Sequence, residues 1–138
     1  MARGANPLRR AGVGHLAALC ASTYAAAAEP PIPPPARQAI DQVHAAAARN
    51  DLAALRGLMT EEFTWSFGAG ADTDPDQAIA AWRQDTDAIA ALERITAEDC
   101  DRVSEQTIEC PRGAGMSWRA GFTESPDGWR LAYFVAGD

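Results

Sequence analysis

The sequence predicts an α+β fold in which helices pack on an antiparallel sheet. Apolar side chains recur every three or four positions between residues 36 and 95, which indicates helices. From Asp99 to the C-terminus, apolar and polar residues alternate between short turn-forming segments, which is typical of antiparallel strands. Helices and strands therefore occupy mainly separate parts of the chain, as in α+β proteins.

The N-terminus is typical of a cleavable export signal over residues 1–28. Three arginines precede a short apolar run that begins at Leu16–Leu19, and the small residues Ala26–Ala28 suit a cleavage site. A proline-rich linker over residues 29–36 then leads into one domain at 37–138. The predicted localisation is periplasmic or secreted.

Composition excludes several classes of partner. The predicted signal contains three of the 12 arginines and none of the 19 acidic residues, so the remaining 110 residues carry a net charge of −10. Such an acidic chain, which has no lysine, is unsuited to nucleic acid or to anionic lipid headgroups. No segment after the signal has the ~20 apolar residues that would span a bilayer, so no membrane attachment is expected.

The cysteines predict one disulfide. Cys20 leaves with the signal, so Cys100 and Cys110 remain in an oxidising compartment, where they are expected to pair. Two strand registers are open. Pairing Cys100 with Cys110 puts Asp101 opposite Glu109, whereas pairing Val103 with Ile108 would set the cysteines diagonally.

Two helices and a strand are predicted first. Residues 30–35 suit an extended polyproline segment, and an apolar stripe predicts a helix over 36–49. Asn50-Asp51 interrupts that helix and can cap a short second one, whose buried side holds Leu52, Leu55 and Met59. Phe63, Trp65 and Phe67 then alternate with polar residues as in a half-buried strand, which the glycine-rich residues 68–70 end.

A third, long helix has the clearest start signal. Asp74 suits the N-cap, Pro75 the first helical position, and Gln77 can complete a capping box. The helix should run to about Ile95. Its inner face is predicted to hold Ile79, Trp82, Thr86, Ile89 and Leu92.

The predicted sheet follows as a meander. Val103 and Ile108 flank a turn at 104–106, and a second turn lies at 111–115. Alternation predicts a strand over 116–123 with Met116, Trp118, Ala120 and Phe122 on its buried face. Ser125-Pro126-Asp127-Gly128 has type I turn chemistry. Residues 129–136 are apolar on both faces apart from Arg130, as expected of a central strand.

This order of elements, together with residues 48–65, resembles the NTF2-like (SnoaL-like) superfamily over residues 36–138. More narrowly, residues 63–68, 78–82 and 128–138 are similar to a group of uncharacterised exported proteobacterial proteins. The resemblance implies a cone in which a curved sheet wraps the long helix and often holds a small apolar ligand. Enzymes of the superfamily place an Asp–His, Tyr–Asp or similar pair inside the cone, and no such pair aligns with this chain.

The candidate site residues are six side chains that could line a ligand pocket. They are Trp65, Phe67, Trp82, Trp118, Tyr133 and His44. His44, three residues after Asp41, could form an acid–base pair, but its place on an apolar stripe predicts a structural role. A lone histidine does not suit zinc, and residues 72–76 lack the glycine and distal glutamate of a calcium loop. No catalytic residue, metal or cofactor is predicted.

The predicted function is a small exported, non-enzymatic domain. It would bind a small apolar molecule in the cone or a protein partner in the cell envelope. Two alternatives remain: an interaction module whose cone is filled by side chains, and an isomerase- or hydrolase-like enzyme using Asp41 and His44. An open cavity lined by a polar group would favour ligand binding or catalysis, and a plugged cone would favour the interaction module. The sequence makes no prediction of oligomeric state.

Overall fold

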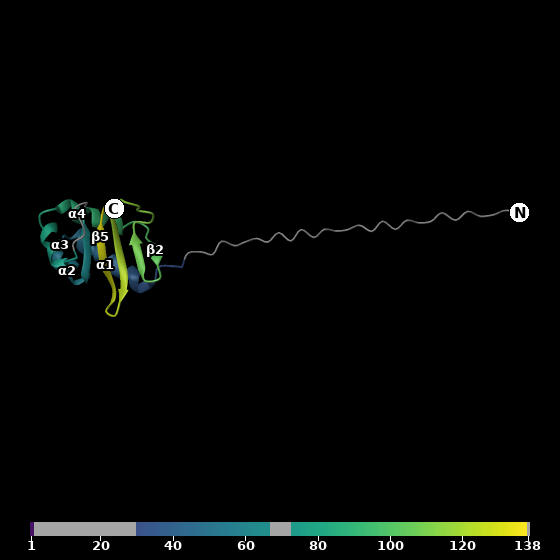
Figure 1. Cartoon of the computed structure of the whole chain (residues 1–138), viewed down its shortest axis with the longest axis horizontal. Helices are drawn as coiled ribbons and strands as arrows, with labels where there is room; N and C mark the ends of the chain where they lie inside the picture. Colours follow the sequence, from purple (N-terminus) through teal and green to yellow (C-terminus); the bar gives the residue numbers. More distant parts are fainter. Residues whose placement is uncertain (2–29, 67–72, 138) are drawn as a thin grey trace.

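The computed structural model describes residue 1 and residues 30–66 and 73–137, and it has the predicted α+β class. One five-stranded sheet has the strand order β1-β5-β4-β3-β2. Figure 1 shows α1 passing behind the strands, with α2, α3 and α4 grouped at the side away from β2. The elements are α1 Pro34–Ala48, α2 Leu52–Gly57, β1 Met59–Ser66, α3 Pro75–Trp82, α4 Thr86–Thr96, β2 Asp101–Ser104, β3 Thr107–Cys110, β4 Arg119–Ser125 and β5 Gly128–Val135.

Helix α1 begins at Pro34, two residues before the predicted start. Prolines are tolerated in a first turn because their missing N–H would have no partner inside the helix. The first intrahelical bond runs from the Arg37 N–H to the Pro33 carbonyl (3.0 Å). The prediction of extended chain through residue 35 is therefore wrong at its last two residues, and the extended segment ends at Pro33.

The connection from α1 to β1 follows the prediction closely. The Asp51 carboxylate caps α2 by accepting a hydrogen bond from the Ala54 N–H (3.0 Å), and Asn50 adopts a positive φ of 51°. Leu55 is fully buried. Met59 is also buried, but it is the first residue of β1 and packs from the strand instead of from the helix.

The predicted long helix is two helices, α3 and α4. Asp74 caps α3 as expected, accepting from the N–H groups of Asp76 (2.8 Å) and Gln77 (3.4 Å). Asp85 does the same for α4, with the N–H groups of Asp87 and Ala88. An aspartate that takes these donors ends one helix and starts the next, because it offers them an alternative to the helical ladder. Thr86, predicted on the inner face, is exposed as the first residue of α4.

Strand β5 lies inside the sheet, as predicted, but one of its two neighbours, the edge strand β1, runs parallel to it. It pairs antiparallel with β4 and parallel with β1, which the antiparallel prediction did not include. A register shift opposite Gly121 and Phe122 leaves Ala132 as an extra residue in β5. The bulge lets Leu131 and Phe134 both face the core although they are three residues apart.

Strand β4 begins at Arg119, three residues after the predicted start. Residues 111–118 form a loop in which Gly113 and Gly115 have positive φ, so the alternation before Arg119 does not reflect a strand. Met116, expected on the buried face, is exposed. Its carbonyl instead accepts a hydrogen bond from the Gly137 N–H (2.7 Å). The predicted turn at residues 125–128 is confirmed as the link between β4 and β5.

The predicted disulfide is confirmed. Cys100 and Cys110 are bonded, with their Cα atoms 4.4 Å apart. Asp101 pairs with Glu109, so the strands adopt the first of the two registers that the sequence left open. Both cysteines are buried, and the bridge ties the start of β2 to the end of β3.

Candidate functional site

The space beneath the sheet, where the sequence placed a ligand cone, holds tightly packed aromatic rings. Trp82 is 1% exposed and meets Phe63 and Phe134 edge-on, with ring centroids 5.7 Å apart in each case. Trp118 stacks on the same Phe134 ring at 5.0 Å. The inward position of Trp82 is therefore confirmed, and Phe134 lies between it and Trp118. These rings act as core.

Two other candidates of the predicted pocket are Trp65, in β1, and Phe67. Trp65 pairs with Phe134 across β1 and β5 and is half-buried on the inner side of the sheet. Phe67 lies outside the described residues.

Tyr133 lies on the opposite face of the sheet from this core. It precedes Phe134 in β5, so its side chain points the other way. Its hydroxyl donates to Glu109 Oε2 at 2.5 Å. Burial and then this hydrogen bond raise the pKa of Tyr133 above its usual range, because both disfavour the phenolate. The structure therefore does not bring Tyr133 together with Trp82 and Trp118.

His44 links α1 to α4. Its Nδ1 donates to the Glu93 carbonyl (2.9 Å), and Thr96 Oγ1 lies 3.3 Å away. A carbonyl can only accept, so Nδ1 carries the hydrogen in this bond. Asp41 is exposed on α1, and the bonds of the His44 imidazole run to α4 instead. The structure does not pair these two residues.

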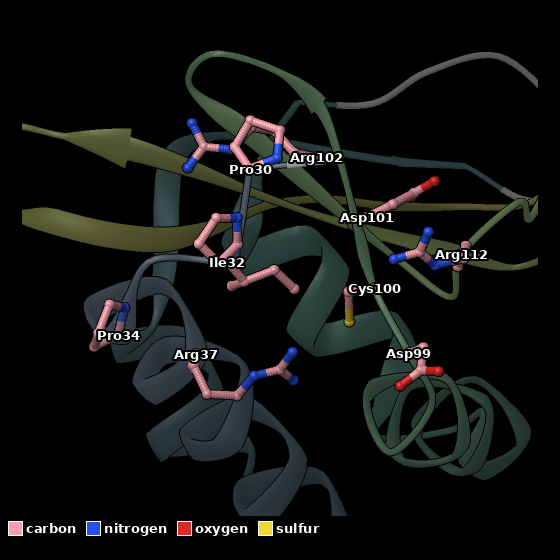
Figure 2. A pocket seen from close by; sticks show the side chains of 10 residues that line it. Pro30, Ile32, Pro34, Arg37, Asp99, Cys100, Asp101, Arg102 and Arg112 are labelled. Carbon is pink, nitrogen blue, oxygen red and sulfur yellow. The ribbon is translucent and has the colours of Figure 1, made fainter. Parts of the chain in front are cut away.

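A hollow of about 590 Å³ lies between the N-terminal proline segment and the disulfide. We call it the disulfide hollow (Figure 2). Its walls come from the extended residues before α1, the first turns of α1, the start of β2 and the loop after β3. It is lined by Pro30, Pro31, Ile32, Pro34, Arg37, Asp99, Cys100, Asp101, Arg102 and Arg112.

The charge of this hollow is opposite in sign to that of the chain. Three arginines and two aspartates line it, an excess of one positive charge in a protein of net charge −7. Figure 2 shows the side chains of Arg37 and Arg112 turned toward Cys100 from opposite sides. Within residues 30–66 and 73–137, Arg37 forms no ion pair. A guanidinium without a counter-ion is therefore available at the edge of the hollow.

The Arg102 side chain is fixed by a hydrogen bond to the backbone. One terminal nitrogen, Nη1, donates to the Glu105 carbonyl (3.1 Å). Its Nε is buried and has no hydrogen-bond partner among the described atoms. A buried donor of this kind costs free energy unless water or a ligand satisfies it.

The positive end of α1 faces the same hollow. Pro34, its first residue, lines the wall, no side chain caps the helix, and its first turn contains no acidic residue. Because Pro34 and Pro35 have no N–H groups, this helix end offers no backbone donor at its first two positions.

Two smaller hollows lie elsewhere on the described part of the chain. One of about 270 Å³ is lined by Arg56 and Arg130. Arg56 is paired with Asp76 (2.7 Å) and Glu61 (3.3 Å), and Arg130 donates to the Gly57 carbonyl. The hydrogen bond to Asp76 and then that to Glu61 raise the pKa of Arg56. The other, about 410 Å³, lies between α1 and α2 and is lined by Arg49 and by mostly small or apolar side chains. Arg49 forms no ion pair within the described residues, but this hollow is smaller than the disulfide hollow and has one cation instead of three.

No sequence pattern indicates the disulfide hollow as a whole. Its only sequence signals were the proline run and the predicted disulfide, which together define two of its walls. Arg37 and Arg112 are 75 positions apart, and no local pattern indicates that they face the same space.

Two kinds of feature are absent from the described part of the chain. No group of three or more His, Cys, Asp or Glu side chains there could hold a metal ion. No helix among these residues has both the length and the apolar character needed to cross a membrane.

Comparison with known proteins shows similarity in structure alone. No protein-family model matches the sequence, and no curated protein matches it. An NTF2-like protein of unknown function from Shewanella oneidensis is 13% identical, with 73% of this chain and 94% of that one covered and a TM-score of 0.47.

Two further solved structures are also described as NTF2-like proteins. An NTF2-like protein with a cystatin-like fold from Novosphingobium aromaticivorans is 20% identical, over 72% of this chain and 76% of that one, with a TM-score of 0.42. An NTF2-like protein of unknown function from Pseudomonas putida is 10% identical, over 72% and 80%, with a TM-score of 0.46. The superfamily named in these descriptions is the one that the sequence resembles.

Proposed function

We propose that the protein is an exported, non-enzymatic domain that binds a small molecule in the disulfide hollow. The cone itself is filled by aromatic side chains, which argues against a ligand there and leaves the protein-interaction module as the alternative. The observation that carries this proposal is Arg37, a cation without a counter-ion at the edge of a hollow with apolar and charged walls. A volume of about 590 Å³ lies in the range of small-molecule sites, roughly 300–1,000 Å³.

The walls of the hollow are suited to binding because they are stiff. Prolines restrict the backbone on one side, and the Cys100–Cys110 bridge restrains β2 and β3 on the other. A site that is ordered before the ligand arrives loses less conformational entropy on binding.

Export is part of the proposal. Residues 1–28 have the composition of a cleavable signal, and an oxidising compartment is where a disulfide such as Cys100–Cys110 persists. Cleavage after Ala28 would leave a chain that begins at Glu29, one residue before the wall of the hollow.

Binding is favoured over acid–base catalysis by the positions of the proton-transfer candidates. The His44 ring bonds to α4, and Tyr133 bonds to Glu109 on the other face of the sheet. Neither side chain lines the disulfide hollow.

Native mass spectrometry of protein purified from its own cell envelope tests both parts of the proposal. The intact mass should correspond to residues 29–138 with one disulfide, and a small molecule should be retained. Pro31→Trp, which fills the hollow from an exposed position, should abolish retention. Pro126→Trp, at the exposed β4–β5 turn, is the matched control and should retain the molecule.

Two results would contradict the proposal. A mature protein that keeps residues 1–28 would disprove export by cleavage. A retained molecule that survives Pro31→Trp would place binding outside the disulfide hollow.

A further inference from the structure

We infer that the ligand of the disulfide hollow is an organic monoanion whose carboxylate binds the Arg37 guanidinium. This inference rests on the proposed binding function and adds the chemical class of the ligand.

Arg37 and Arg112 approach from different elements. Arg37 is the fourth residue of α1, and Arg112 belongs to the loop that follows β3. Figure 2 shows their guanidinium groups on opposite sides of the chain at Cys100, so the carboxylate is assigned to Arg37, which forms no ion pair within the described residues. A guanidinium presents parallel N–H donors that match the two oxygens of a carboxylate, so this arrangement suits a planar anion.

The charge balance selects a single negative charge. Asp99 and Asp101 also line the hollow and offset two of its three arginines. A monoanion would neutralise the remaining positive charge, whereas a doubly charged phosphate would be left with an excess of negative charge beside two carboxylates.

The rest of the ligand should be apolar. Ile32 packs against the core from the middle of the hollow, and Pro30, Pro31 and Pro34 add apolar wall. These surfaces gain free energy when an aliphatic or aromatic group displaces water from them. The ligand class is therefore a carboxylic acid with a hydrocarbon body.

A matched pair of probes tests the inference on the disulfide-bonded mature protein. Octanoate and octanamide have the same chain and differ in the charge of the head group. Binding of each is followed by the amide and arginine Nε–H resonances in NMR titrations. We expect octanoate to bind at least about tenfold more tightly than octanamide, since hydrogen bonds to charged groups contribute about 1.5–3 kcal/mol.

Variants locate the head group. Arg37→Gln should weaken octanoate binding about tenfold and leave octanamide binding unchanged. Arg37→Lys keeps the charge but loses the paired donors. Its affinity for octanoate should therefore lie between that of the parent protein and that of Arg37→Gln. Arg49→Gln, at the other end of α1, removes the same charge and should bind octanoate like the parent protein. Inorganic phosphate should compete with octanoate weakly or not at all.

The possible failures separate the inference from the proposed function. Equal binding of octanoate and octanamide, or effective competition by phosphate, would overturn the inference. A neutral co-purified molecule that Pro31→Trp displaces would also overturn it while leaving the binding function in place. If no molecule co-purifies and neither probe perturbs the hollow, the inference and the proposed function both fail.

Discussion

The Tyr133 side chain crosses Gly121 to reach Glu109, with 2.5 Å between the phenol oxygen and Oε2. Gly121 pairs with Tyr133 on one side and with Glu109 on the other, so one side-chain contact spans β5, β4 and β3. A Cβ atom on Gly121 would lie 1.9 Å from Tyr133 Cε1. The absence of a side chain at position 121 is therefore a condition for this contact.

Gly121→Ala should destabilise the protein by about 1–3 kcal/mol, the usual cost of overpacking. The new methyl group and the Tyr133 ring cannot occupy the same space, so the ring must leave Gly121 and lose its bond to Glu109. Chemical denaturation measures the change.

A double-mutant cycle shows whether that clash is the cause. Gly121→Ala combined with Tyr133→Ala should cost less than the sum of the two single changes, because alanine at 133 leaves room for the methyl group. Additive effects would mean that Gly121 matters for another reason.

Tyr133 should titrate at a higher pH than a free tyrosine. It is the sole tyrosine of the predicted mature chain, so tyrosinate absorbance of residues 29–138 reports this side chain alone. Above about pH 10, the usual tyrosine pKa, the unfolded chain loses the phenol proton while the folded chain keeps it. Unfolding then releases a proton, so stability falls as the pH rises further.

Two variants check the origin of that pH dependence. Tyr133→Phe should remove this part of the alkaline loss of stability. Glu109→Gln should lower the pKa of Tyr133 only in part, because burial contributes more than the hydrogen bond. An unshifted tyrosine in the folded parent protein would contradict the contact.

Trp82→Ala should cost about 3–5 kcal/mol, as is typical when a buried large aromatic side chain is truncated. Trp82 is 1% exposed and packs against Phe63 and Phe134, which come from two different strands. Thermal or chemical unfolding measures the effect. Trp129→Ala, at a half-buried position, is the comparison and should cost less. A Trp82 variant as stable as the parent protein would show that α3 does not pack on the sheet as described.

Removing the disulfide should reduce stability by roughly 2–3 kcal/mol. The Cys100–Cys110 bridge closes a loop with a sequence separation of 10, and the chain-entropy relation gives this magnitude for so short a loop. The double variant Cys100→Ser/Cys110→Ser, unfolded in urea beside the oxidised parent protein, measures the difference. Because Cys100 lines the disulfide hollow, octanoate binding should also weaken. Unchanged stability would mean that the bridge constrains little in the unfolded chain.

Asp85→Ala should destabilise the protein by about 1 kcal/mol through loss of the α4 N-cap. The side chain of Asp87, exposed in the first turn of α4, takes no part in the capping bonds, which use its backbone N–H, so Asp87→Ala is a control that removes the same charge. Equal effects of the two changes on the urea midpoint would show that charge, instead of capping, is what matters at this helix end.

The sequence by itself determined the features that depend on neighbouring residues. The apolar stripe of α1, the Asp51 and Asp74 caps and the turn at residues 125–128 follow from side chains a few positions apart. The disulfide could also be predicted, since a hairpin turn separates its cysteines. The helix break at Asp85 had a local signal too, an aspartate that can cap, but the apolar stripe continues across it.

Only the tertiary structure decided which distant segments meet. The parallel pairing of β1 with β5 joins residues about half the chain apart, and the bulge at Ala132 decides which side chains of β5 enter the core. Tyr133 was expected in the pocket beside Trp82 and instead faces Glu109. The disulfide hollow exists because folding brings Arg37 and Arg112 to either side of Cys100. Such contacts depend on the packing of the whole chain, so a local sequence pattern does not predict them.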